Sequence, residues 1–157
     1  MTTLYPKPYD CSECGQHPNQ DFYIFTPTND WIISFPGQQL FHLHFGEATF
    51  EEDEDIAQAK FVADYYYHRM HEHPHVSFFF ILDMSKVDNS ALISDRAKQI
   101  YRIILEHPQL VAGVVYGATT DMQAMVHLMA EDTDKTVTTV STKQAADQIY
   151  QHWHRGQ

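Results

Sequence analysis

An apolar run from Phe78 to Leu82 constrains the fold of this chain more than any other feature. Consecutive apolar residues, with no polar ones alternating between them, are typical of a strand that is covered on both faces. The run ends in Asp83, and a polar turn then precedes an amphipathic segment. Because α/β domains commonly place functional groups where a buried strand leads into a helix, we expect a candidate loop here. Its candidate residues are Asp83, Ser85, Asn89 and Ser90.

The rest of the chain alternates between strand and helix patterns. Residues 1–20 show no periodicity and are expected to form an irregular arm, whereas residues 21–155 are expected to form a single α/β domain. We expect strands at 22–26, 31–35, 40–45, 75–84, 110–116 and 135–140, and helices at about 50–72 and 90–106. A third helix is expected after Thr119 or Thr120 as its cap, and a last helix after Ser141 or Thr142. The order is β-β-β-α-β-α-β-α-β-α. Short turns predict antiparallel strands at the N-terminal edge of a mixed sheet, and helical crossovers predict parallel C-terminal strands.

Charge and composition exclude several classes of function. The formal net charge of −11 argues against a nucleic-acid partner, whose phosphates require a basic surface. No stretch approaches the length of a membrane-spanning helix, the N-terminus lacks the apolar core of a signal peptide, and two cysteines cannot build a disulfide framework. We therefore expect a cytoplasmic protein. The acidic run from Glu51 to Asp55 is interpreted as a solvated helix N-terminus.

Four segments in the same order resemble those of one family. They are Leu43–Thr49, Ile81–Val87, Val114–Gly117 and Val140–Ala146, each a strand end that leads into a turn or helix. On these segments the chain resembles the STAS-like domains, the family of the anti-sigma-factor antagonists. The resemblance implies a non-enzymatic signalling module that binds a regulatory protein or a kinase. It also implies that the chain is either a short regulator or the N-terminal domain of a larger protein such as a sensor kinase, with a homodimer as a further option.

Two hypotheses remain for Ser90. The resemblance makes it the counterpart of the serine that is phosphorylated in the family, yet the family motif contains a glycine where this chain has Ala91-Leu92. The alternative is that Ser90 or Asn89 caps the following helix, as serine and asparagine commonly do.

The N-terminal arm contains a candidate metal site. Cys11 and Cys14 have the CxxC spacing of zinc ligands, and His17 follows closely. His42 or His44 could complete the four ligands. An ordinary pair of reduced cysteines, or a disulfide between them, is the alternative.

Aromatic residues suggest a second functional hypothesis. If the helix that contains Tyr65-Tyr66-Tyr67 packs on Phe78-Phe79-Phe80, these rings and nearby methionines could line an apolar pocket for a lipid or chromophore. The candidate lining residues are Tyr66, Phe79 and Met125. Catalysis is not expected, because the chain has neither a nucleophile elbow nor a phosphate-binding glycine loop. A partner-binding module predicts a filled core, whereas a ligand sensor predicts a cavity.

Overall fold

The computed structural model describes residues 22–25, 28–46, 51–89 and 93–157. Six strands lie in these ranges: β1 (Phe22–Phe25), β2 (Asp30–Phe35), β3 (Leu40–His44), β4 (Phe78–Asp83), β5 (Leu110–Tyr116) and β6 (Thr136–Val140). The helices are α2 (Glu52–Glu72), α3 (Asp95–Leu105), α4 (Thr120–Ala130) and α5 (Lys143–Arg155), with a short 3-10 turn, η1 (Pro36–Gln38), between β2 and β3.

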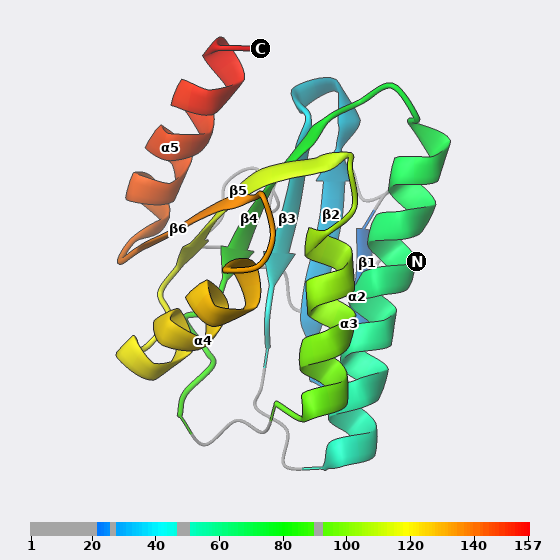
Figure 1. The fold of residues 1–157 in the computed structure, drawn as a ribbon, viewed down its shortest axis with the longest axis vertical. Helices are drawn as coiled ribbons and strands as arrows, with labels where there is room; N and C mark the ends of the chain where they lie inside the picture. The colour runs from blue at the N-terminus through cyan, green and yellow to red at the C-terminus, as the bar shows by residue number, and fades with distance from the viewer. Residues whose placement is uncertain (1–21, 26–27, 47–50, 90–92) are drawn as a thin grey trace, which may run out of the picture.

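The strands form one mixed sheet in sequential order, β1-β2-β3-β4-β5-β6 (Figure 1). β2 runs antiparallel to both β1 and β3, whereas β3, β4, β5 and β6 are parallel. The predicted α/β class and element order are therefore confirmed.

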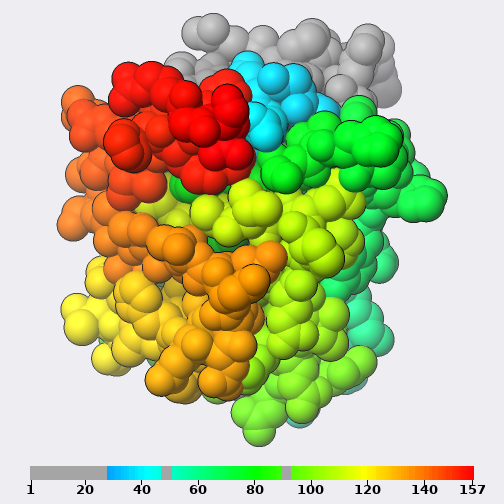
Figure 2. All heavy atoms as spheres, turned by 45° about the horizontal axis from the view of Figure 1, so that its top comes forward, coloured from blue at the N-terminus to red at the C-terminus, as the bar shows by residue number. Residues whose placement is uncertain are grey.

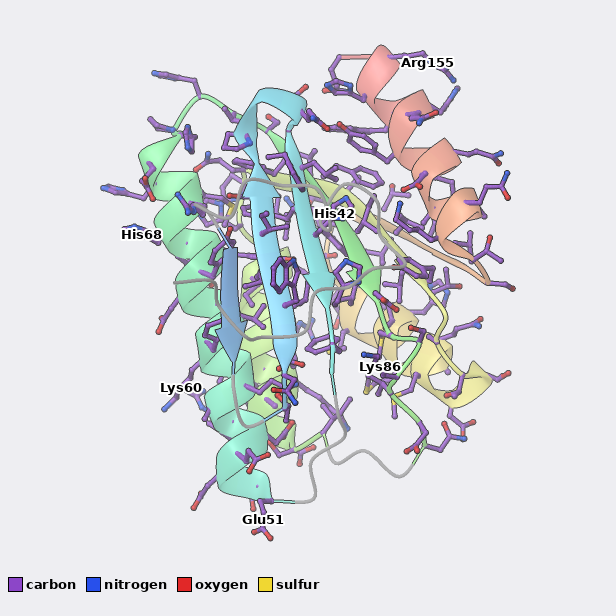
Figure 3. The ribbon with its side chains drawn as sticks, turned by 180° about the vertical axis from the view of Figure 1, so that it is seen from behind. His42, Glu51, Lys60, His68, Lys86 and Arg155 are labelled. Carbon is purple, nitrogen blue, oxygen red and sulfur yellow. The ribbon has the colours of Figure 1, made fainter. Side chains whose placement is uncertain are left out.

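This topology determines the layers of the domain. Each parallel crossover advances one strand in the same direction, and right-handed crossovers then place α2, α3 and α4 on one face of the sheet. The last helix, α5, packs on the opposite face, and the buried apolar residues accordingly form two clusters. Figure 3, seen from behind, shows β2 and β3 in front of α2 and α3.

β4 contributes to both clusters because its side chains alternate. Phe78 and Phe80 face α2 and α3, and Phe41 of β3 stacks between Phe78 and Tyr66 with centroid distances of 4.4 and 4.3 Å. Phe79 points to the other face and contacts Trp153 of α5 at 5.1 Å. The two-sided burial expected for this strand is confirmed.

Helix α3 begins later than the start at about residue 90 that the sequence predicts. It starts at Asp95, and the Ser94 hydroxyl caps it by accepting a hydrogen bond from the backbone N–H of Ala97 (3.1 Å). The prediction that Asn89 or Ser90 caps this helix is therefore wrong. Ser90 itself lies outside the described residues.

None of the helices within the described ranges combines the length and the apolar character that crossing a bilayer requires.

Replacement of Gly113 by alanine should destabilise the fold. A Cβ atom at this position of β5 would lie 2.3 Å from the Phe80 ring of the neighbouring strand. Because the ring is packed in the core, its displacement should cost about 1–3 kcal/mol of unfolding free energy, measured by urea titration.

Gly37→Ala is the matched control, since a Cβ atom on this turn residue meets nothing within 4 Å. Equal stabilities of the Gly113→Ala and Gly37→Ala variants would contradict the packing described here.

Candidate functional site: an apolar cavity between the helices and the sheet

The core on the helical face is not filled. A cavity of about 110 Å³ lies between α2, α3, α4 and the sheet. Most of its lining is apolar and comes from all three helices and from β3 to β6: Leu43, Phe45, Val62, Phe80, Leu82, Met84, Val87, Ile93, Ile104, Leu105, Leu110, Val115, Met125, Val126, Met129 and Val137. The remaining lining residues are Asp55, Gln58, Tyr66 and Tyr101.

Two of the three predicted pocket residues lie in this lining. Tyr66 of α2 and Met125 of α4 face the cavity, as expected. The prediction for Phe79 is wrong, because strand alternation puts this ring on the opposite face, against Tyr150 and Trp153.

The part of the cavity wall formed by α3 and α4 is the least buried. Met125 and Met129 of α4 and Leu105 of α3 are half-buried rather than fully enclosed. Outside them, Arg102 of α3 forms an ion pair with Asp132 in the turn between α4 and β6. Figure 2 shows α3 (light green) and this turn (orange) side by side on the surface. Methionine side chains are flexible and an exposed ion pair contributes little stability, so the side chains of this wall can rearrange at low cost.

A buried polar cluster includes the cavity-lining residue Gln58. Asp30, at the start of β2, is fully buried and accepts hydrogen bonds from the backbone N–H of Gly46 (2.7 Å), the Thr28 hydroxyl (2.6 Å) and the Gln58 amide (2.7 Å). Burial raises the pKa of Asp30, although these hydrogen bonds oppose the shift. Gly46 is required here, because a Cβ atom would lie 1.9 Å from the carbonyl oxygen of Thr28.

Asp55 is a second buried carboxylate and lines the cavity. It is 1% exposed, and its Oδ2 accepts a hydrogen bond from the backbone N–H of Ser94 at 2.7 Å. This contact joins the first turn of α2 to the start of α3. The interpretation of Glu51–Asp55 as a wholly solvated helix N-terminus is therefore wrong for Asp55, whereas Glu52 and Asp53 are exposed.

Two tyrosines add hydroxyl groups to the cavity lining. Burial raises the pKa of Tyr66, and the nearby Tyr65 adds to the shift. Burial also raises the pKa of Tyr101 well above its ordinary value, and Asp30, Asp55 and Tyr66 raise it further. Both hydroxyls therefore remain protonated at neutral pH and can donate hydrogen bonds.

The predicted loop begins with a buried ion pair. The Asp83 carboxylate is 5% exposed, and its Oδ2 lies 2.8 Å from Nδ1 of His44 at the end of the neighbouring strand. Its Oδ1 accepts hydrogen bonds from the backbone N–H (2.8 Å) and the hydroxyl (2.6 Å) of Ser85. Burial alone would raise the pKa of Asp83, but these hydrogen bonds and the charge of His44 lower it.

The rest of the loop is at the surface. Ser85 and Asn89 are exposed, and the Asn89 carbonyl oxygen accepts a hydrogen bond from the Thr119 hydroxyl (2.6 Å). Thr119 is also the N-cap of α4. The loop is thus attached to the helix that supplies Met125 to the cavity.

The candidate zinc ligands Cys11, Cys14 and His17 lie outside the described residues. His42 and His44 are buried side by side on β3, on the face away from α2 (Figure 3). Within the described ranges, no group of three or more histidine, cysteine, aspartate or glutamate side chains is arranged to hold a metal ion.

Comparisons of the chain with protein-family models, with curated proteins and with solved structures give no significant match. The resemblance to STAS-like domains therefore remains a hypothesis from the sequence.

The sequence did not identify Asp55 or Gln58 as cavity residues. A usable signal was present, because Asp55, Gln58, Val62 and Tyr66 recur at three- and four-residue intervals on one face of α2. The polarity of Asp55 and Gln58 concealed that they belong to the inner face.

Replacement of Asp83 by asparagine should give a stability loss that depends on pH. Because the pKa of Asp83 is lower in the folded protein than its ordinary 3.8, the ionised carboxylate stabilises the fold above that value, and this contribution disappears as the pH falls through the folded-state pKa. Asp83→Asn should therefore cost about 2 kcal/mol at pH 7, and the difference from the parent protein should shrink below about pH 4. Urea titrations across this pH range measure both effects.

Asp64→Asn, on the exposed face of α2, is the control and should change stability by less than about 0.5 kcal/mol throughout. A stability difference for Asp83→Asn that does not vary with pH would contradict the assigned ion pair.

Proposed function

We propose that this chain is a non-catalytic regulatory domain that binds a small apolar molecule in the cavity between α2, α3, α4 and the sheet. The observation that carries the proposal is the unfilled, mostly apolar cavity in an otherwise packed core. Protein interiors are normally close-packed, and a void in the core reduces stability. A ligand that fills the void would recover that loss.

The size and lining of the cavity support a small ligand. Its volume of about 110 Å³ is of the same order as engineered apolar cavities of about 150 Å³ that bind benzene. A single ring or a short alkyl chain therefore matches the space better than a long lipid. The adaptable wall that includes Met125 and Met129 would allow such a molecule to enter.

The geometry at the strand ends supports a role without catalysis. The Ser85 hydroxyl donates its hydrogen bond to Asp83, and Asp83 also accepts from His44. An activated serine would instead donate to an imidazole base. The three side chains are therefore better suited to fixing the start of the loop than to nucleophilic attack.

The loop after β4 connects residues that line the cavity with residues at the surface. Met84 and Val87 line the cavity, whereas Ser85 and Lys86 between them are exposed; Figure 3 shows Lys86 on this turn, near α4. The Asn89–Thr119 hydrogen bond joins the same turn to α4. A ligand that shifts Met84 and Val87 would thus change the surface that this loop presents.

In this proposal the regulatory protein or kinase expected from the sequence contacts the loop at residues 84–89, in the cytoplasm. The ligand is the signal, and the loop reports whether the cavity is occupied.

Ligand-free protein should be stabilised by small apolar probes. Toluene at a free concentration about a hundred times its Kd should raise the unfolding midpoint by about 5–10 °C. The Val126→Phe variant should lose this shift, because the larger side chain from α4 occupies the cavity. Thermal unfolding followed by circular dichroism gives the measurement, and native mass spectrometry of the purified protein tests for a ligand already bound.

Ile103→Phe is the control, because Ile103 is 52% exposed on α3 and does not line the cavity. The proposal fails if toluene stabilises neither the parent protein nor this control, or if it stabilises Val126→Phe equally well.

A further inference from the structure

We infer that the ligand of this cavity carries one uncharged hydroxyl group on a small apolar body, as phenols and short alcohols do, and that Tyr66 and Tyr101 hold that hydroxyl. This inference rests on the proposed function and specifies its ligand class.

The Tyr66 hydroxyl is the first supporting observation. Tyr66 is only 4% exposed, lines the cavity, and stacks its ring on Phe41 with a centroid distance of 4.3 Å. Among the residues that the structure describes, none forms a hydrogen bond with its hydroxyl. A hydroxyl that lines an apolar cavity without a protein partner can gain a hydrogen bond from a bound molecule. A ligand in the cavity would supply that partner.

Tyr101 brings a second hydroxyl to the same region from α3. Its ring packs edge-to-face on Phe45 at 6.1 Å, and across the described ranges its hydroxyl also has no hydrogen-bond partner. Tyr66, Tyr101 and Asp55 all line the same cavity.

Two further lining residues of the cavity, Asp55 and Gln58, carry oxygen acceptors. Asp55 uses Oδ2 for the backbone N–H of Ser94, and Gln58 uses its amide nitrogen for Asp30. Within the described part of the chain, Oδ1 of Asp55 and the amide oxygen of Gln58 accept no hydrogen bond. The cavity therefore offers two tyrosine donors together with two acceptors. A hydroxyl group, which both donates and accepts, satisfies this combination.

The charges near the cavity exclude an anion. Asp55 lines the cavity, and Asp30 lies behind Gln58, so that a ligand carboxylate would be repelled while also losing its hydration. An ammonium group would be attracted by Asp55, but it only donates hydrogen bonds and would leave the protons of both tyrosine hydroxyls without an acceptor. The charges and hydrogen-bonding groups of the cavity lining therefore favour a ligand whose polar group is uncharged.

Four probes of similar size test this assignment on ligand-free protein by isothermal titration calorimetry: p-cresol, toluene, benzoate and benzylamine at pH 7. We expect p-cresol to bind about tenfold more tightly than toluene, and benzoate to bind at least about a hundredfold more weakly than p-cresol. Tyr66→Phe should reduce the affinity for p-cresol about tenfold and leave the affinity for toluene unchanged. Tyr65→Phe is the control, because the Tyr65 hydroxyl bonds to Ser34 outside the cavity (3.1 Å), and it should leave the p-cresol-to-toluene ratio unchanged.

The outcomes separate this inference from the proposed function. Equal affinities for p-cresol and toluene, tighter binding of benzylamine or benzoate, or an unchanged ratio in Tyr66→Phe would overturn the ligand class while the cavity remained a binding site. No binding of any probe would overturn both. If circular dichroism shows that Tyr66→Phe does not fold, Tyr101→Phe at its half-buried position decides by the same criterion.

Discussion

The burial of β4 on both faces is the constraint on which the rest of the structure depends. Phe78 and Phe80 require a helical layer on one side, and Phe79 requires a second layer, supplied by Trp153 and Tyr150 of α5, on the other. Since α2, α3 and α4 all lie in right-handed crossovers that advance in one direction, they share a face, and α5 covers part of the other. The same strand ends at Asp83, where the neighbouring β3 delivers His44.

Three helices on one face enclose the cavity, and its chemistry follows from the inner stripe of α2. That stripe begins with Asp55 and Gln58 and continues with Val62 and Tyr66. One oxygen of Asp55 accepts a hydrogen bond from the Ser94 backbone, and the amide nitrogen of Gln58 donates to Asp30. The other carboxylate oxygen of Asp55 and the amide oxygen of Gln58 have no hydrogen-bond partner among the described residues. In the proposed function, the polar and apolar parts of the lining would recognise an amphiphile by position as well as by size. The turn from Met84 to Asn89 would then relate the occupied state to a surface that a partner can contact.

Much of the fold could be predicted from the sequence, because strongly apolar runs and helical periodicity give element type and order. The sequence offers Thr119 or Thr120 and Ser141 or Thr142 as helix caps, and in the structure Thr119 caps α4 and Thr142 caps α5. Ser94 was missed because Ser90 offers the same side chain four residues earlier, and only the tertiary contact of Asp55 with the Ser94 backbone favours the later start. The site was harder to predict. The positions of Tyr66 and Met125 in the lining can be predicted from the apolar faces of their helices. The side of the sheet on which Phe79 lies depends on the strand register, which the apolar run does not give. Asp55 belongs to an acidic run whose other members are mostly exposed, so its burial could not be recognised from the sequence.

The most direct test of the account is a crystal structure of the protein grown with 4-bromophenol, in which anomalous scattering locates the bromine atom. We expect bromine inside the cavity between α2, α3, α4 and the sheet, with the phenol oxygen within hydrogen-bond distance of the Tyr66 or Tyr101 hydroxyl. A bromine signal only on the molecular surface, at a concentration that saturates binding in solution, would contradict it.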